Sequence, residues 1–223
     1  RQFIQEQDRS VILLIDVSAS MRYFSSEQSR AEMVLEVAAA FATLAQQGND
    51  KIGLILFSDR IERYIPPARG NMYMVLDVVS RHSSSHKQTD LRAALMFLMG
   101  LVYKDAVVLV ISDWIEEGTQ KSASLLKIAA KRHDVIAVRI TDKCEQALPA
   151  IGMFEIEDPE TGQQCTLDAR SGRMIQRLLD ERLQDYKRLL DTSGIEVLDL
   201  IVGQPFVPAI ARFLHKRSTM TRS

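Results

Sequence analysis

The segment VILLIDVSASM, Val11–Met21, decides how the rest of the sequence is interpreted. Five apolar residues lead into Asp16, and Ser18 and Ser20 follow it at alternate positions. An unbroken apolar run is typical of a parallel strand that is covered on both faces. We therefore expect a buried strand that ends in a carboxylate and two hydroxyls, which could form a turn, a nucleophile or a metal site.

Three further segments share this apolar, β-branched character and are predicted to be strands: Lys51–Phe57, Ala106–Ser112 and Asp134–Ile140. Apolar residues at helical spacing predict helices between the strands, over Arg30–Gln47, Asp90–Val102 and Thr119–Arg132. Alternation of strands and helices predicts an α/β fold, a doubly wound, mostly parallel sheet flanked by helices.

Other segments depart from this alternation. Ile61–Ile65 follows Phe57 too closely for a helical crossover, so it is expected to be an antiparallel edge strand that Pro66-Pro67 closes. Two short strands around a turn in Met153–Asp168 predict a hairpin inserted at about residues 150–170. The last predicted elements are a helix, a strand and a helix, at Met174–Leu190, Glu196–Val202 and Pro208–His215. We expect residues 1–223 to form a single domain.

The composition excludes several classes of protein. A net charge of −1 over 223 residues gives no bulk attraction to nucleic acid or to an anionic membrane. No apolar run approaches the ~20 residues that span a bilayer, and no signal peptide is visible. We therefore expect a cytoplasmic protein without a membrane span in this chain. Because the chain begins at Arg1 and not at Met, we expect a fragment, and anchoring through a segment upstream stays open.

The ends of the strands carry the polar residues of interest. In an open α/β sheet, ligands bind in the crevice at the carboxyl ends of the strands. The first strand ends at Asp16, a later strand ends at Ser112-Asp113, and Thr89 precedes the helix that starts at Asp90. We therefore predict one metal site made of Asp16, Ser18, Ser20, Thr89 and Asp113.

An all-oxygen set of ligands suits a hard divalent cation, with Mg²⁺ expected first and Mn²⁺ or Ca²⁺ as alternatives. The absence of His and Cys from the set argues against zinc. In a simpler interpretation, Ser18 and Ser20 cap the next helix and Asp113 is a turn residue. Three short motifs in this order are more specific than any one of them, and they favour the metal. Trp114 either anchors a partner at the rim of the site or packs in the core.

The sequence argues against catalysis. It has no Gly-x-Ser-x-Gly elbow, no phosphate-binding loop, and no His placed by sequence to activate a serine. A phosphate-transferring aspartate at the end of a first strand usually has a second carboxylate two residues later, where this chain has Ser18. We expect binding without turnover. A metal-dependent hydrolase that uses the same crevice and a structural module with a vestigial site stay open as alternatives.

The motif Asp16-x-Ser18-x-Ser20, with Thr89 and Asp113, resembles the metal-ion-dependent adhesion site (MIDAS) of von Willebrand factor type A (VWA) domains. The resemblance runs from Val11 to the final helix and implies a VWA or Rossmann-like fold. It also implies that the hydroxyls and carboxylates surround a metal ion. One position on that ion would stay open for a Glu or Asp of a protein partner.

A narrower resemblance is to the prokaryotic "domain of unknown function 58" family. It rests on four segments: Arg1–Ile4, Leu148–Gly152, Asp158–Gly162 and Gly194–Leu198. Members often accompany MoxR-type AAA+ ATPases, so the resemblance implies such an ATPase as a working partner. Family members normally carry an N-terminal segment, sometimes with membrane helices, that is missing here.

Overall fold

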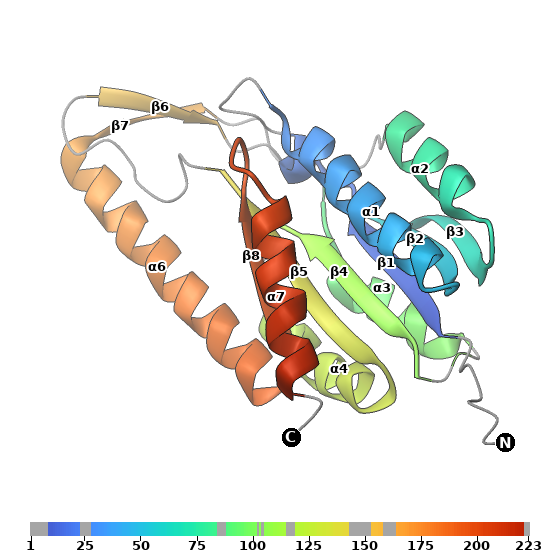
Figure 1. Cartoon of the computed structure of the whole chain (residues 1–223). Helices are drawn as coiled ribbons and strands as arrows, with labels where there is room; N and C mark the ends of the chain where they lie inside the picture. Colours follow the sequence, from blue (N-terminus) through green and yellow to red (C-terminus); the bar gives the residue numbers. More distant parts are fainter. Residues whose placement is uncertain are drawn as a thin grey trace, which may run out of the picture.

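The computed structural model describes residues 9–22, 28–83, 88–101, 103, 105–114, 119–142, 153–157 and 164–220. Its centre is a six-stranded sheet in the order β3-β2-β1-β4-β5-β8 (Figure 1). The strands are β1 (Ser10–Asp16), β2 (Lys51–Phe57), β3 (Ile61–Ala68), β4 (Val107–Ser112), β5 (Asp134–Thr141) and β8 (Glu196–Ile201). Each pairs in parallel with its neighbours except at the edge, where β3 is antiparallel to β2. The predicted fold class is confirmed.

Helices cover both faces of the sheet (Figure 1). One face packs against α1 (Arg30–Gln47), α2 (Met72–Arg81) and α7 (Val207–Met220). The other packs against α3 (Leu91–Gly100), α4 (Thr119–Arg132) and α6 (Ala169–Thr192). A short 3₁₀ helix, η1 (Ala19–Arg22), links β1 to the segment before α1. None of the helices within the described ranges has both the length and the apolar character needed to cross a membrane.

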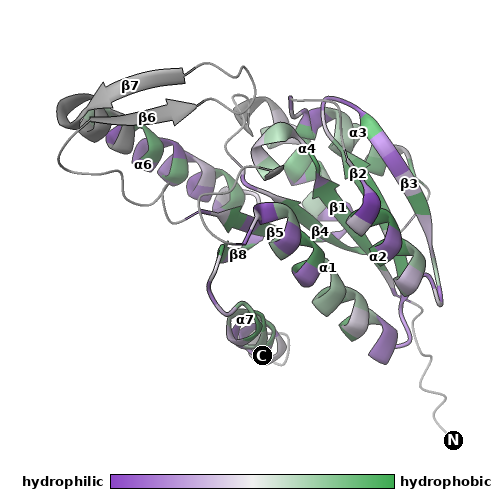
Figure 2. Cartoon of the chain, turned by 90° about the horizontal axis from the view of Figure 1, so that it is seen from above, coloured by the Kyte–Doolittle hydropathy of each residue, from purple (hydrophilic) through white to green (hydrophobic). Residues whose placement is uncertain are grey.

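The first strand shows why its sequence is so apolar. Successive side chains of a strand point to opposite faces, so β1 contributes to both cores. Leu13 and Ile15 pack on the side of α1, whereas Ile12 and Leu14 pack on the side of α3. Figure 2 shows the apolar strands as a layer between the two layers of helices. Burial on both faces makes β1 a rigid support for the residues that follow it.

Two local features differ from the sequence-based expectations. Strand β3 does not end before Pro66-Pro67 but continues through both prolines to Ala68. Proline is tolerated there because β3 is an edge strand, where an N–H on the open side has no strand to bond. The facing Gly53 provides room, since a Cβ atom at Gly53 would lie 2.8 Å from Cγ of Pro67. Helix α2 was not predicted, because its valine-rich sequence buries few residues, Met72 and Val75, and its periodicity is short.

The hairpin predicted at about residues 150–170 is confirmed. Strands β6 (Met153–Glu157) and β7 (Gln164–Asp168) pair antiparallel in a sheet of their own (Figure 1). Three of the four segments that carry the narrower resemblance, residues 1–4, 148–152 and 158–162, lie outside the described residues. The fourth, Gly194–Leu198, leads into β8, and Gly194 has a positive φ of 69°.

Candidate metal centre

The candidate site lies where the strand order reverses. The chain passes outward from β1 to β2 and from β4 to β5, so a crevice forms at the carboxyl ends of the neighbouring strands β1 and β4. Asp16 is the last residue of β1, and Asp113 directly follows β4. Both carboxylates are buried, with exposed fractions of 1% and 4%. Carboxylates are seldom buried in this way unless charged or hydrogen-bonding partners compensate them.

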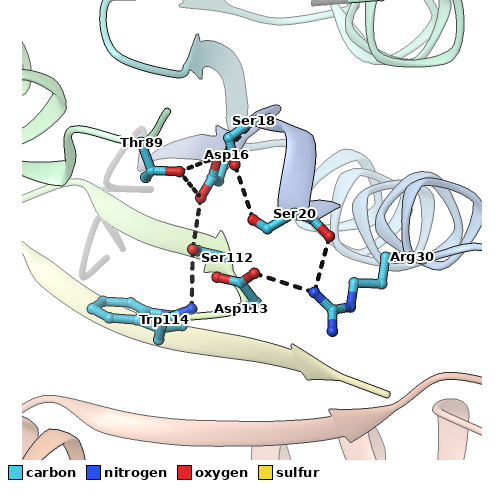
Figure 3. A network of polar contacts seen from close by, with 8 residues as sticks. All are labelled: Asp16, Ser18, Ser20, Arg30, Thr89, Ser112, Asp113 and Trp114. Carbon is cyan, nitrogen blue, oxygen red and sulfur yellow. Dashed lines mark hydrogen bonds and ion pairs between the residues drawn. The ribbon is translucent and has the colours of Figure 1, made fainter. Parts of the chain in front are cut away.

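The predicted hydroxyls gather around Asp16 (Figure 3). The Thr89 hydroxyl lies 3.4 and 3.5 Å from the two carboxylate oxygens of Asp16. The Oγ atoms of Ser18 and Ser20 are 3.1 Å apart, and the Ser18 backbone N–H donates to Asp16 Oδ1 at 2.9 Å. Ser20 lies in the 3₁₀ helix η1, and its hydroxyl lies against that of Ser18, which directly precedes the helix.

The helices that follow these loops have N-caps of their own. Ser29 caps α1, and its reciprocal hydrogen bonds with Glu32 form a capping box. Asp90 caps α3 by accepting a hydrogen bond from the Ala93 N–H at 2.9 Å. The interpretation of Ser18 and Ser20 as caps of the next helix is therefore wrong for α1. The hydroxyls of Ser18 and Ser20 therefore do not cap α1.

Ser112 belongs to the same network, although it is not one of the five predicted metal ligands. Its hydroxyl donates to Asp16 Oδ2 at 2.8 Å and accepts from the Trp114 N–H at 3.2 Å. The signal was its place as the last residue of a predicted strand, beside Asp113. Ser112 fixes the orientation of the Asp16 carboxylate.

Arg30 is a second residue of the site that sequence reasoning missed. Its side chain is 2% exposed, and Nη1 lies 3.2 Å from Asp113 Oδ2 and 2.9 Å from the Ser20 carbonyl oxygen, to which it donates. A signal was present: Arg30 precedes Met33 and Val34 by three and four residues, so it lies on the buried stripe of α1. The helix thereby directs a cation into the crevice.

Trp114 packs in the core, which decides between the two alternatives given above. Its exposed fraction is 6%, and its ring centroid lies 5.1 Å from that of Tyr186. The indole N–H donates to the Val138 carbonyl at 3.4 Å. Its φ of 59° is rare for a residue with a large side chain, so the backbone directly after Asp113 is held in an unusual conformation.

The electrostatics of Asp16 follow from its surroundings. Burial, and after it the negative charge of Asp113, raises the pKa of Asp16 from 3.8 to about 7. Hydrogen bonds from Ser18 and Ser112 act in the opposite direction, but they do not overcome the burial. Ionised Asp16 is therefore costly unless a further positive charge is close to it.

This shift predicts how the stability of the metal-free protein depends on pH. Folded Asp16 holds its proton up to a pH of about 7, whereas an unfolded Asp releases it near 3.8. The contribution of Asp16 to the free energy of unfolding is therefore full below about pH 4 and is lost as the pH rises to about 7. Urea unfolding in EDTA should show Asp16→Asn gaining stability relative to the wild type over this range. If the free energies of unfolding of the two proteins change with pH in the same way, the raised pKa of Asp16 is contradicted.

The residues present fit a hard divalent cation. Two buried carboxylates and three hydroxyls offer oxygen ligands, as Mg²⁺ prefers. No group of three His, Cys, Asp or Glu side chains that could hold a metal occurs in the described part of the chain. A site here would therefore depend on the serine and threonine hydroxyls. A cavity of about 350 Å³ adjoins Asp113 and extends between α6 and the ends of β5 and β8.

Comparisons with known proteins bear on the family and the fold. Residues 1–185 match the family model "Protein of unknown function DUF58". The uncharacterized protein Rv1480 of Mycobacterium tuberculosis is 22% identical over 97% of this chain and 70% of its own length. The conserved hypothetical protein BatB of Bacteroides thetaiotaomicron has 17% identity and a TM-score of 0.58, with 96% of this chain and 100% of that one covered.

A VWA domain is among the similar structures. The VWA domain of SpRpn10 aligns with a TM-score of 0.53 and 11% identity, over 92% of this chain and 94% of its own. At such low identity the likeness concerns the fold. The chain belongs to the DUF58 family, and its fold is that of a VWA domain.

Proposed function

We propose that this chain is a metal-dependent protein-binding module and not an enzyme. Asp16, Ser18, Ser20, Thr89 and Asp113 would hold Mg²⁺, or Mn²⁺ or Ca²⁺ in its place. The observation that supports the proposal most is the grouping of two buried carboxylates with three hydroxyls at the carboxyl ends of β1 and β4 (Figure 3). When bound, the ion would supply a positively charged position to which a carboxylate oxygen of a Glu or Asp from a partner protein can bind.

The protein's own residues would prepare this position before any partner arrives. Ser112 orients Asp16, while Arg30 holds Asp113 and the backbone of Ser20. Asp16 ends β1 and Asp113 directly follows β4, two central strands of the sheet, so little conformational entropy is lost when a partner binds. Such preparation suits recognition of a single carboxylate by a small site.

The composition of the network supports binding over catalysis. The eight side chains in Figure 3 include no His, Cys or Lys that could act as a general base or nucleophile. Both carboxylates lie in the candidate metal set. A metal-dependent hydrolase remains the second candidate, because a metal ion can activate water without such groups. Turnover of phosphoesters by the Mg²⁺- or Mn²⁺-loaded protein, abolished by Asp16→Asn, would favour it.

The partner that we propose is a MoxR-type AAA+ ATPase, as the family resemblance implies. The cavity beside Asp113 would receive the residues that flank the partner's carboxylate. Its walls combine apolar and charged side chains, among them Leu183, Arg139 and Lys187. A mixed surface of this kind suits a polar protein segment.

Two measurements test the proposal together. Mg²⁺ at about 100 times its dissociation constant should raise the free energy of unfolding by about 2.7 kcal/mol, seen as a higher Tm. A purified MoxR-type ATPase encoded near the gene for this chain should bind in Mg²⁺ and dissociate in EDTA. An unchanged Tm at millimolar Mg²⁺, Mn²⁺ and Ca²⁺ would overturn the metal site. Binding of the ATPase that survives EDTA would overturn metal-dependent recognition by this partner.

A further inference from the structure

Arg30 is buried, which is unusual for an arginine side chain. Its guanidinium is buried, and it arises from the first turn of α1 to reach Asp113 and the carbonyl of Ser20 (Figure 3). The guanidinium of an arginine is not deprotonated in proteins. The site therefore holds a permanent positive charge beside one of its two candidate metal-ligating carboxylates.

The charges of the network decide what the loaded site attracts. Among the eight side chains drawn in Figure 3, those that carry charge are Asp16, Asp113 and Arg30. With both carboxylates ionised, the network has a net charge of −1, and a divalent cation would change this to +1. Without Arg30 the loaded site would be neutral. A single charge has a large effect on the attraction between this site and an ion, because buried charges are weakly screened.

We propose that Arg30 is the specificity-determining residue of this site, because it keeps the metal-loaded centre cationic and thereby selects an anionic partner. The inference rests on the metal-dependent binding proposed above and adds the source of its preference for a carboxylate. It also predicts a cost. The positive charge of Arg30 repels the incoming metal ion. It therefore lowers the affinity of the site for the metal while it raises the affinity of the loaded site for the carboxylate.

The contrasting interpretation makes Arg30 a structural anchor that holds η1 against Asp113. The two interpretations differ in the sign of one effect. Loss of an anchor loosens the site and weakens the binding of metal and of carboxylate together. Loss of the positive charge strengthens the binding of metal and weakens that of carboxylate. Opposite changes therefore identify the electrostatic role.

The experiment compares Arg30→Met and Arg30→Gln, which remove the charge, with Arg30→Lys, which keeps it. Isothermal titration measures the affinity for Mg²⁺, and broadening of the acetate methyl proton signal by Mn²⁺-loaded protein measures the affinity for a carboxylate. We expect the neutral variants to bind Mg²⁺ roughly tenfold more tightly and acetate roughly tenfold more weakly, while Arg30→Lys stays close to the wild type. Arg30→Gln also keeps an N–H donor for the Ser20 carbonyl.

The outcomes separate this inference from the proposal on which it rests. If the neutral variants lose affinity for metal and acetate together, keep both affinities, or fail to fold at saturating Mg²⁺, Arg30 is not the specificity determinant. If the wild-type protein itself binds neither Mg²⁺ nor Mn²⁺, the proposed function fails. If acetate binds equally well to the metal-free protein, carboxylate recognition through the metal fails, whatever the variants do.

Discussion

Replacement of Asp16 by Asn should lower the affinity of the protein for Mg²⁺ by at least about 100-fold, because even the outer partners of metal ligands typically contribute 10–100-fold. Asp16 is the residue on which the network converges, since Ser18, Ser112 and Thr89 all contact its carboxylate. Asn keeps the shape and one acceptor oxygen but loses the charge. Isothermal titration calorimetry at pH 8 should show the loss, together with the loss of ATPase capture.

Asp59→Asn provides the matched control. Asp59 lies in the turn after β2, the strand next to β1, and its side chain is 34% exposed and paired with Arg60. The same chemical change at that position should leave the Mg²⁺ affinity within about twofold of the wild type, since solvent screens a partly exposed charge outside the site. Equal losses in the two variants would mean that general surface charge, and not the candidate site, binds the metal.

Replacement of Asp113 by Ala should lower the free energy of unfolding of the metal-free protein by about 3 kcal/mol, because it removes the carboxylate that faces a buried guanidinium. The pair is 3.2 Å apart, and both side chains are at most 5% exposed. Relief of repulsion at Asp16 offsets part of the loss. Urea unfolding in EDTA measures the change.

A double variant and an exposed pair give the controls for Asp113→Ala. Combining it with Arg30→Met removes both buried charges and should recover most of the lost stability. Asp77→Ala disrupts the exposed pair with Arg81 on α2 and should change the free energy of unfolding by less than about 1 kcal/mol. Additive losses in the double variant would show that the buried pair does not stabilise the fold as a unit.

The sheet could be predicted from the sequence because its strands are buried on both faces. β2 and α1 have the predicted bounds, since apolar runs and strong stop signals coincide there. Helix α2 was not predicted because its sequence is rich in β-branched residues, as strand sequences are, and its buried stripe is too short to give a clear helical period. The end of β3 was predicted too early for a different reason. Pro66 and Pro67 are tolerated in this strand because it lies at the edge of the sheet, and the order of the strands follows from the whole fold and not from the local sequence.

The part of the candidate site that could be predicted consists of polar residues at the ends of predicted strands. The positions of Asp16 and Asp113 follow from the rule for strand ends, and the structure brings the predicted residues together. Arg30 could not be chosen from residue type alone, because an arginine in the first turn of a helix is usually solvated. Its spacing to Met33 and Val34 places it on the apolar stripe of α1, but the burial of the stripe as far as the first turn depends on how α1 packs against the sheet.

The position of Trp114 has a practical consequence. It is the sole tryptophan of the chain, it is buried, and it follows Asp113 directly, with its backbone N–H bonded to Ser112. Indole emission from this protein therefore has one source, one peptide bond away from a candidate ligand and next to the ring of Tyr186. The chain carries its own optical probe, so the arrival of an ion can be followed by intrinsic fluorescence without any label.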